Sequence, residues 1–373
     1  MANVKPSVRV YKTFSRVGKE IKFIATGEGN PRNGEGAFLR LQNGHILFAY
    51  TRYVGEDYHD ACRAHIVGIE SADEGSTWST PRVLLDFPHE AGNVMSVSLL
   101  RMNNGDVGLF YVQHVVTDVH PGLCLGKMIR SADDGQTWSA PLPITPDNYY
   151  VVNNDRVLRL QNGDIFLAAA LHDVREDCNR TNEKIARSVA CFFRSTDDGR
   201  SFRDEGIRLE APFKEVDAVG LQEPGLFQFE DGRLWAYFRT RLGCQYRSLS
   251  DDNGHTWSAP MPDFRFTSPR APMLVKTVGS YTVAIFNPVP EGAYTAPPFG
   301  MDRTPLMLSV SEDGGNTFLR SYLLEDDPKN AYCYPAVIEV EGGFLVAYYH
   351  SNGTGQFLNC TKITKVLFEE IRE

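Results

Sequence analysis

The sequence has no long apolar run, and this absence limits where the protein can work. No stretch approaches the roughly 20 apolar residues that a helix needs to cross a bilayer. The segment from Met1 to Lys12 also lacks the apolar core of a secretory signal. We therefore expect no membrane partner and a cytoplasmic location.

Basic residues are in deficit as well. The chain carries 38 Lys and Arg against 47 Asp and Glu, which gives a net charge of −9. Such a field opposes binding to the phosphate backbone of nucleic acids, so no nucleic acid partner is expected. No glycine-rich loop of the kind that cradles phosphate opens a helix, and no cofactor is expected.

The seven cysteines are odd in number, scattered, and free of any CxxC pair. Disulfide frameworks and zinc sites use paired or closely spaced cysteines, so we expect reduced structural thiols. His114, His172 and His350 lack the close spacing of metal ligands, and we expect no metal site there.

What the chain does contain is a repeat, which we call the Asp box. The pattern Ser-x-Asp-x-Gly-x-Thr/Ser-Trp/Phe occurs five times, 55 to 64 residues apart, with its aspartate at Asp73, Asp133, Asp197, Asp252 and Asp313. In each copy the carboxylate can accept backbone N–H bonds, the glycine can take a positive φ, and the aromatic ring fills the adjacent space. Five copies of a hairpin turn indicate a structural repeat rather than a catalytic motif.

Between the Asp boxes lies a second periodic feature, two apolar alternating strands joined by a tight glycine turn. Six copies can be read, with turns at Gly44, Gly105, Gly163, Gly232, Gly279 and Gly342. Five copies precede an Asp box and the sixth precedes a single strand, so we expect an N-terminal strand from Val8 to Phe23 to complete the last sheet. The sequence predicts an all-β fold, a six-bladed β-propeller with Asp-box hairpins that forms one domain over residues 1–373.

In such a blade both hairpin turns lie at one face, and the start of the inner strand lies at the other. Counting about eight residues from each inner turn, at ~3.3 Å per residue, reaches the mouth of the central channel. The residues there are polar: Glu35, Ser96, Asn154, Asp155, Glu223, Arg270 and Tyr334 on the inner strands, and Arg52, Gln113, His114, His172, Arg239, Asn287 and His350 on the second strands. This convergence predicts that the functional site lies at the mouth.

At these positions the chain resembles the sialidase (neuraminidase) superfamily, over essentially its whole length. The segment 222–225, followed by Arg239, is similar to the sialidase segment that holds the catalytic glutamate and the second arginine of a carboxylate-binding triad. Arg303, before the fifth Asp box, matches the third arginine. Tyr334 matches the nucleophilic tyrosine, and Asp60 matches the loop aspartate that serves as acid/base.

The resemblance implies an exo-glycoside hydrolase that cleaves a terminal acidic sugar, sialic acid or a related one, from a glycan with retention. Tyr334 would be the nucleophile and Glu223 its base partner, since a carboxylate nucleophile would be repelled by the acidic sugar. Asp60, on a loop, would be the acid/base if desolvation on closure of that loop raises its pKa. Arg239 and Arg303 would bind the substrate carboxylate.

One position departs from the sialidase pattern. Where that family has its first triad arginine, this chain has Glu35, with Arg32 upstream and Arg52 at the end of the neighbouring strand. Glu35 would then accept hydrogen bonds from sugar hydroxyls. The substrate-binding candidates are therefore Arg32, Glu35, Arg52, Asp155, Arg239 and Arg303.

Two other functions fit the same mouth. A glycosidase acting on a neutral or uronic sugar would use the carboxylates of Glu35, Asp155 and Glu223, and inversion at the anomeric carbon would exclude the tyrosine mechanism. A non-catalytic propeller would bind glycans or dock proteins, and tight sugar binding without turnover would identify it.

Overall fold

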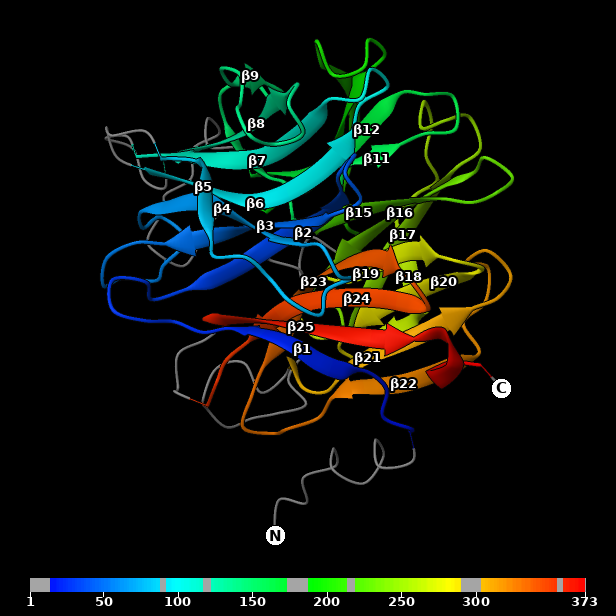
Figure 1. Ribbon diagram of the computed structural model, residues 1–373. Helices are drawn as coiled ribbons and strands as arrows, with labels where there is room; N and C mark the ends of the chain where they lie inside the picture. The colour runs from blue at the N-terminus through cyan, green and yellow to red at the C-terminus, as the bar shows by residue number, and fades with distance from the viewer. Residues whose placement is uncertain are drawn as a thin grey trace, which may run out of the picture.

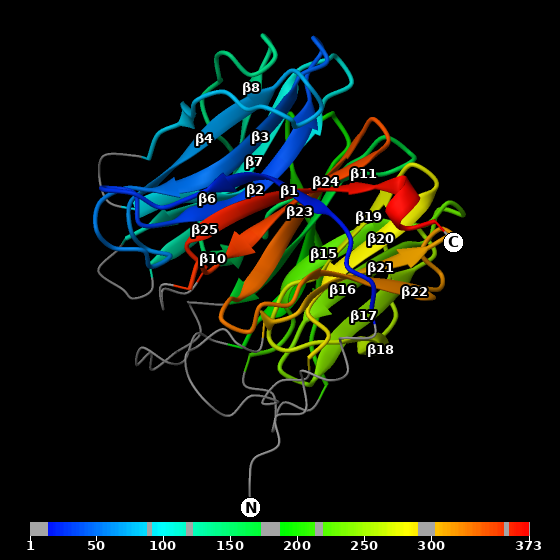
Figure 2. The ribbon, with the colours of Figure 1, turned by 60° about the horizontal axis from the view of Figure 1, so that its bottom comes forward.

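The computed structural model describes residues 14–87, 92–116, 122–172, 187–212, 219–289, 303–353 and 358–372. Its regular structure is almost entirely β-strand, so the predicted all-β class is confirmed. A short 3₁₀ helix lies at Phe368–Glu370. None of the described segments forms a helix long and apolar enough to span a bilayer. Figures 1 and 2 show the sheets lying side by side.

The strands pair into four sheets of four strands and one of nine. The first four-stranded sheet contains β2 (Asn33–Arg40), β3 (Ile46–Tyr53), β4 (Ala64–Ser71) and β5 (Arg82–Leu85). Another contains β15 (Gln222–Gln228), β16 (Leu234–Arg239), β17 (Cys244–Ser250) and β18 (Met261–Thr267). The next contains β19 (Leu274–Val278), β20 (Tyr281–Phe286), β21 (Leu306–Ser311) and β22 (Arg320–Glu325). The last contains β23 (Tyr332–Val340), β24 (Gly343–His350), β25 (Cys360–Leu367) and β1 (Lys19–Ile24).

The nine-stranded sheet combines two groups of strands that follow one another in the chain. The first group is β6 (Gly92–Arg101), β7 (Val107–Val115), β8 (Leu123–Ser131) and β9 (Leu142–Pro143). The second group is β10 (Tyr149–Val151), β11 (Leu158–Arg159), β12 (Ile165–His172), β13 (Val189–Ser195) and β14 (Arg203–Leu209). The two groups meet through β10, which pairs with β8 at a single parallel bridge between Tyr149 and Cys124. The sequence did not predict β10.

All six predicted inner hairpins are present, and each is antiparallel. They are β2–β3, β6–β7, β11–β12, β15–β16, β19–β20 and β23–β24. The predicted N-terminal strand is also found, because β1 pairs with β25 and completes the last sheet (Figure 1). Its bounds differ from the expected Val8 to Phe23, and the first part of that prediction lies outside the described residues.

The five Asp boxes form hairpins with the same internal hydrogen bonds. In the first box, Ser71 Oγ donates to Asp73 Oδ1 over 2.8 Å and accepts from Gly75 N over 2.8 Å. Thr77 donates through its backbone N to Oδ1 and through its hydroxyl to Oδ2 of Asp73, at 2.7 and 2.6 Å. The other four copies repeat these four bonds. The motif is therefore structural, as its chemistry predicts.

Arginines at the ends of three inner strands connect neighbouring groups of strands. Arg101 donates to Gly105 O of its own turn at 2.8 Å, to Asp134 of its own Asp box at 2.7 Å, and to Arg40 O of the preceding sheet at 2.8 Å. The side chains of Arg40 and Arg159 repeat this pattern. Each of these arginines thus ties a turn, an Asp box and the preceding inner strand together.

The hydrophobic core consists of clusters that lie between successive groups of strands. One cluster joins the β2–β5 sheet to β6–β8, a second joins β6–β8 to β10–β13, and a third joins β11–β13 to the β15–β18 sheet. Further clusters join β15–β18 to β19–β22, and β19–β22 to the last sheet. A sixth cluster joins the last sheet back to the first.

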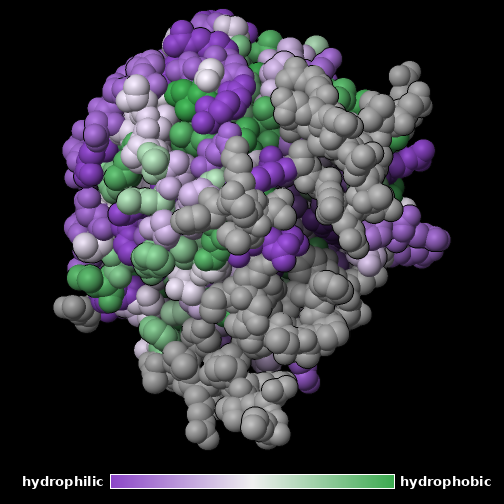
Figure 3. Space-filling model, turned by 180° about the vertical axis from the view of Figure 1, so that it is seen from behind, coloured by the Kyte–Doolittle hydropathy of each residue, from purple (hydrophilic) through white to green (hydrophobic). Residues whose placement is uncertain are grey.

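The described surface seen in Figure 3 mixes hydrophilic and hydrophobic residues.

Candidate active site

Four inner strands begin with a β-bulge that directs a polar side chain into one cavity. The register shifts between Gly34 and Ala37, between Met95 and Ser98, between Gln222 and Gly225, and between Cys333 and Ala336. The bulged residues Glu35, Ser96, Glu223 and Tyr334 have φ angles of 53°, 59°, 42° and 57°. A positive φ costs a non-glycine residue on the order of 1 kcal/mol, and such conformations cluster at functional sites.

These bulges meet at a cavity of about 460 Å³. It is lined by Arg32, Glu35, Tyr58, His59, Asp60, Met95, Ser96, Val112, His114, Cys124, Tyr149, Val151, Asn153, His172, Gln222, Glu223, Arg239, Arg270, Arg303, Tyr334 and Leu358. Seven of the nine candidate site residues are among them. The size suits a monosaccharide with part of its neighbour.

Tyr334, Glu223 and Arg239 form a hydrogen-bonded cluster in this cavity. The phenol of Tyr334 donates to Glu223 Oε1 over 2.8 Å. Arg239 Nη1 donates to Glu223 Oε2 over 2.5 Å and lies 3.3 Å from the phenol oxygen. Glu223 and Arg239 are buried. The predicted pairing of tyrosine with glutamate therefore has the geometry that proton transfer requires.

The charges around this cluster keep the phenol neutral and the carboxylate ionised. Burial raises the pKa of Tyr334 well above its usual value, and the Glu223 carboxylate adds to the effect. Burial alone would also raise the pKa of Glu223, but the Arg239 guanidinium outweighs it and the net pKa is lowered. Glu223 is thus ready to accept a proton and Tyr334 still holds one.

Arg303 lies on the other side of the tyrosine ring. Its guanidinium carbon is 5.7 Å from the ring centroid of Tyr334, and its two Nη atoms donate to Cys333 Sγ at 2.9 Å and to Arg270 O at 3.0 Å. Asn287 donates to the carbonyl of Arg303 at 2.8 Å and fixes its backbone. Arg239 and Arg303 thus both lie next to Tyr334.

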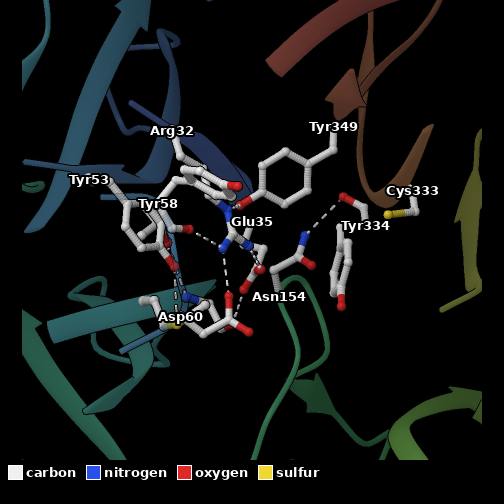
Figure 4. Close-up of polar contacts among 12 residues, drawn as sticks. Arg32, Glu35, Tyr53, Tyr58, Asp60, Asn154, Cys333, Tyr334 and Tyr349 are labelled. Carbon is white, nitrogen blue, oxygen red and sulfur yellow. Dashed lines mark hydrogen bonds and ion pairs between the residues drawn. The ribbon is translucent and has the colours of Figure 1, made fainter. Parts of the chain in front are cut away.

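Arg32 organises a second polar network in the cavity (Figure 4). Its guanidinium donates to Tyr349 Oη at 2.9 Å, Asp60 Oδ1 at 2.6 Å and Glu35 Oε1 at 3.1 Å. Its carbon also lies 4.7 Å from the ring centroid of Tyr53. The close packing explains a glycine two residues later, because a Cβ at Gly34 would lie 1.9 Å from the Tyr349 ring.

In the arrangement observed, the environment of Asp60 favours its ionised form. Desolvation by the surrounding protein alone would raise its pKa, but the Arg32 guanidinium lowers it, and the net shift is downward. The Asp60 side chain is also 66% exposed. Asp60 lies in the cavity as predicted, but as an ion-paired carboxylate rather than a protonated acid.

Glu35 has the opposite character. Its side chain is 5% exposed, accepts a short hydrogen bond from Ser96 Oγ, and accepts from Arg32. Burial raises its pKa to about 7 even though the Arg32 guanidinium opposes the shift. The residue that replaces the expected arginine is therefore a buried carboxyl group that can carry a proton near neutral pH.

Two candidate substrate-binding residues do not reach the cavity. Asp155 has the same backbone conformation as the bulged residues, with φ 53°, but its carboxylate pairs with Lys276 Nζ at 2.8 and 2.9 Å and accepts from Val337 N at 3.0 Å. Arg52 alternates with the buried Tyr53 on β3, so its charge acts on Tyr50 and His65 instead. Both predictions of substrate contact are corrected by these positions.

Other positions predicted at the mouth serve the framework. Asn154 donates to Gly36 O at 2.8 Å and to the carbonyls of Tyr334 and Pro335 at 3.4 and 3.3 Å, so it ties two bulges together. Gln113 and His350 are likewise outside the cavity lining, whereas His114, His172 and Arg270 belong to it.

Sequence reasoning missed several residues that shape the site. Arg156 donates to the carbonyl of Glu223 at 3.2 Å and holds the backbone of that bulge. Tyr149 lies edge-on to His114 and His172, with ring centroids 5.8 and 5.9 Å away, and forms an aromatic wall. Both precede the inner strand of the third hairpin, where the run Asn-Tyr-Tyr-Val-Val-Asn-Asn-Asp is unusually polar and aromatic. Within the described ranges, no group of three or more His, Cys, Asp and Glu side chains is arranged to hold a metal ion.

Comparisons with known proteins agree with this architecture. Many solved structures match, among them three with a TM-score of about 0.7 and low identity. A protein of unknown function from Dyadobacter fermentans is 17% identical, with a TM-score of 0.70, 94% of this chain covered and 99% of that one. The Hadza microbial sialidase Hz136 is 16% identical, with a TM-score of 0.70, 93% of this chain and 68% of that one. The leech intramolecular trans-sialidase is 14% identical, with a TM-score of 0.71, 95% of this chain and 71% of that one.

These likenesses show a sialidase-like fold. No curated protein matches the sequence. A family model for the BNR repeat-like domain matches residues 60–347, which is most of the chain. The protein belongs to the BNR repeat-like domain family.

Proposed function

We propose that the protein is a retaining exo-glycosidase that removes a terminal acidic sugar, sialic acid or a related one, from a glycan. The observation that carries the proposal is the hydrogen bond of 2.8 Å from Tyr334 Oη to the ionised Glu223. A tyrosine with a carboxylate base is the exception among glycosidases that suits a substrate with an anionic anomeric centre. The sialidases with similar folds are consistent with it.

In the first step Tyr334 attacks the anomeric carbon and passes its proton to Glu223. The phenol is neutral before attack, so it does not repel the substrate carboxylate. Arg239 then stabilises both the phenolate that develops and the proton-accepting carboxylate, because it contacts both atoms.

The substrate carboxylate is proposed to bind between Arg239 and Arg303. Guanidinium groups recognise carboxylates in a planar, bidentate manner, and these two flank the nucleophile. Arg32 donates to both Glu35 and Asp60, so we assign it to positioning those two carboxyl groups.

We also propose that the strands form a six-bladed propeller of one domain over residues 1–373, with a carbohydrate as its substrate. Six inner hairpins and six core clusters in a cyclic order support this arrangement. The nine-stranded sheet would then be two blades joined at the bridge between Tyr149 and Cys124.

A substrate panel tests the proposed reaction. Wild type and Tyr334→Phe would be assayed on aryl glycosides of sialic and other acidic sugars, and the anomer released first would be identified by NMR. We expect retention by wild type and loss of cleavage in the variant. Equal activity of the two proteins, inversion, or tight binding without turnover would reject the tyrosine mechanism.

A further inference from the structure

The reaction proposed above needs a proton donor for the departing oxygen. Besides Glu223, which pairs with the nucleophile, the cavity lining includes two carboxyl groups, Asp60 and Glu35. Both contact Arg32, Asp60 through Nη1 and Glu35 through Nη2 of its guanidinium (Figure 4). The question is which of the two can hold a proton and deliver it.

Asp60 is poorly suited to this task in the arrangement observed. It forms an ion pair of 2.6 Å with Arg32, and its side chain is two-thirds exposed, at 66%. Both conditions favour the ionised form, and an ionised carboxylate has no proton to give.

Glu35 meets the geometric requirements. Its carboxyl group is buried, lines the cavity that contains Tyr334, and is fixed by hydrogen bonds from Ser96 Oγ and Arg32 Nη2. The bulge in β2 fixes its backbone at φ 53°. In the view of Figure 4 Glu35 lies between Arg32 and Asn154, on the side toward Tyr334. The charge of Glu35 raises the pKa of Tyr334, so the two groups interact electrostatically within the cavity.

We propose that Glu35 is the general acid/base of the glycosidase, with Arg32 and Ser96 as positioning residues. The inference rests on the proposed function. It assigns the proton donor to the residue that stands where an arginine was expected, and it leaves Arg239 and Arg303 to bind the substrate carboxylate.

The two half-reactions balance as follows. Tyr334 Oη bonds to the anomeric carbon as its proton moves to Glu223, the glycosidic C–O bond breaks, and the leaving oxygen takes the proton of Glu35. Water then attacks the anomeric carbon and gives a proton to the Glu35 carboxylate. The bond to Tyr334 Oη breaks, and the phenol recovers its proton from Glu223.

Several charged and titratable groups face Glu35 and set its proton affinity. Burial raises its pKa to about 7, with the Arg32 guanidinium acting against this shift and the carboxylates of Asp60 and Glu223 acting with it. The tyrosines that its charge influences are Tyr53, Tyr334 and Tyr349, and Cys124 is affected too. Activity should therefore have an alkaline limb near pH 7, because Glu35 must be protonated in the first step.

The leaving group provides the decisive test. For the acidic sugar that wild type cleaves, kcat/KM would be compared between a 4-nitrophenyl glycoside, whose phenolate departs without a proton, and a disaccharide, whose alkoxide cannot. In Glu35→Gln we expect a loss of about 10³-fold on the disaccharide and at most about 10-fold on the nitrophenyl glycoside. The alkaline limb should also vanish from the pH profile.

Three further variants keep the test informative. Asp155→Asn is the matched control, since it changes a carboxylate with the same backbone conformation that lies outside the cavity lining. Asp60→Asn should lower kcat/KM by the same factor on both substrates. Ser96→Ala removes a donor to the ionised Glu35 and should move the alkaline limb to higher pH.

The outcomes distinguish failure of the Glu35 assignment from failure of the proposed function. If wild type cleaves none of the substrates, or Tyr334→Phe matches wild type, both fail. If Tyr334→Phe is inactive but Glu35→Gln behaves like Asp155→Asn, the assignment of Glu35 alone fails. Leaving-group dependence in Asp60→Asn instead of Glu35→Gln would give the acid role to Asp60.

Discussion

The two ends of the inner strands differ in what they repeat. At the turn end both backbone and side chains recur: all five Asp boxes make the same hydrogen bonds, and three arginines make the same contacts to turn, box and neighbouring sheet. At the opposite end only the backbone recurs. Five non-glycine residues there share a positive φ, yet they are Glu35, Ser96, Asp155, Glu223 and Tyr334.

This difference indicates that the turn end serves the stability of the fold and the bulged end serves the chemistry of the site. The bulges present a side chain to the cavity from four of the inner strands, and the identity of that side chain is free to vary. The turn end, with its identical bonds, stabilises the assembly. Substitutions at the turn end should therefore affect unfolding, and substitutions at the bulged end should affect catalysis.

The largest effect should come from the bulged end. Tyr334→Phe should lower kcat/KM by at least about 10³-fold, because it removes the nucleophile, while changing the free energy of unfolding by about 1 kcal/mol or less. Asp155→Asn should leave kcat/KM within about twofold of wild type, because its carboxylate contacts Lys276 rather than the cavity. Kinetics and urea unfolding of both variants check the prediction, and equal kinetic losses would contradict it.

Glu35 should be an exception to this contrast between the two ends. It lies at the bulged end, yet it should affect the free energy of unfolding as well as catalysis. Its pKa is about 7 in the folded protein, against roughly 4.3 when unfolded, so the folded state binds more protons between these values. Stability should fall as pH rises from 4.5 through 7, by up to about 3 kcal/mol. Glu35→Gln should lack this part of the pH dependence. Denaturant unfolding at several pH values measures it, and parallel profiles for the two proteins would refute it.

A smaller effect is expected from the Asp boxes. Ser131→Ala leaves the buried N–H of Gly135 without its acceptor, which should cost about 1 to 2 kcal/mol of unfolding free energy. The Michaelis parameters should stay within about twofold of wild type. A variant with normal stability and impaired kinetics would show that the turn end is coupled to the site.

The smallest effect should come from the arginine contacts. Arg101→Lys cannot reach Gly105 O, Asp134 and Arg40 O at once, and we expect a loss of about 1 kcal/mol. Catalysis should not change. Thermal unfolding measures the loss, and an unchanged melting temperature would indicate that water replaces these bonds.

The fold was predictable because its signals are local and repeated. Each glycine turn between alternating apolar strands, and each Asp box, specifies a hairpin from a few adjacent residues. The short strand β10 was missed because it has three residues, and its pairing with distant β8 at Tyr149 leaves no periodic signal. The start of β1 was misplaced because the early chain has no turn to mark it.

The site was predictable only in part. Counting residues from each turn found Glu35, Glu223 and Tyr334, and the resemblance linked the last two. A bulge inserts an extra residue, however, so the alternation of side chains no longer tells which face the next residue takes. Asp155 was misassigned because its carboxylate contacts Lys276 and Val337 N rather than the cavity, which no local pattern indicates. Arg52 follows simple alternation beside Tyr53. The ionisation of Asp60 depends on Arg32, whose direction is set by tertiary packing against Tyr349.

The pairing of β1 with β25 has a consequence for biosynthesis. Lys19 and Lys365 are register partners, so β1 stays without this neighbour until the chain up to β25 has been made. Closing so large a loop is slow compared with forming hairpins. The final sheet should therefore be the last to become protected from amide hydrogen exchange during refolding. Nascent chains that stop before Cys360 should expose an unpaired strand edge that promotes aggregation.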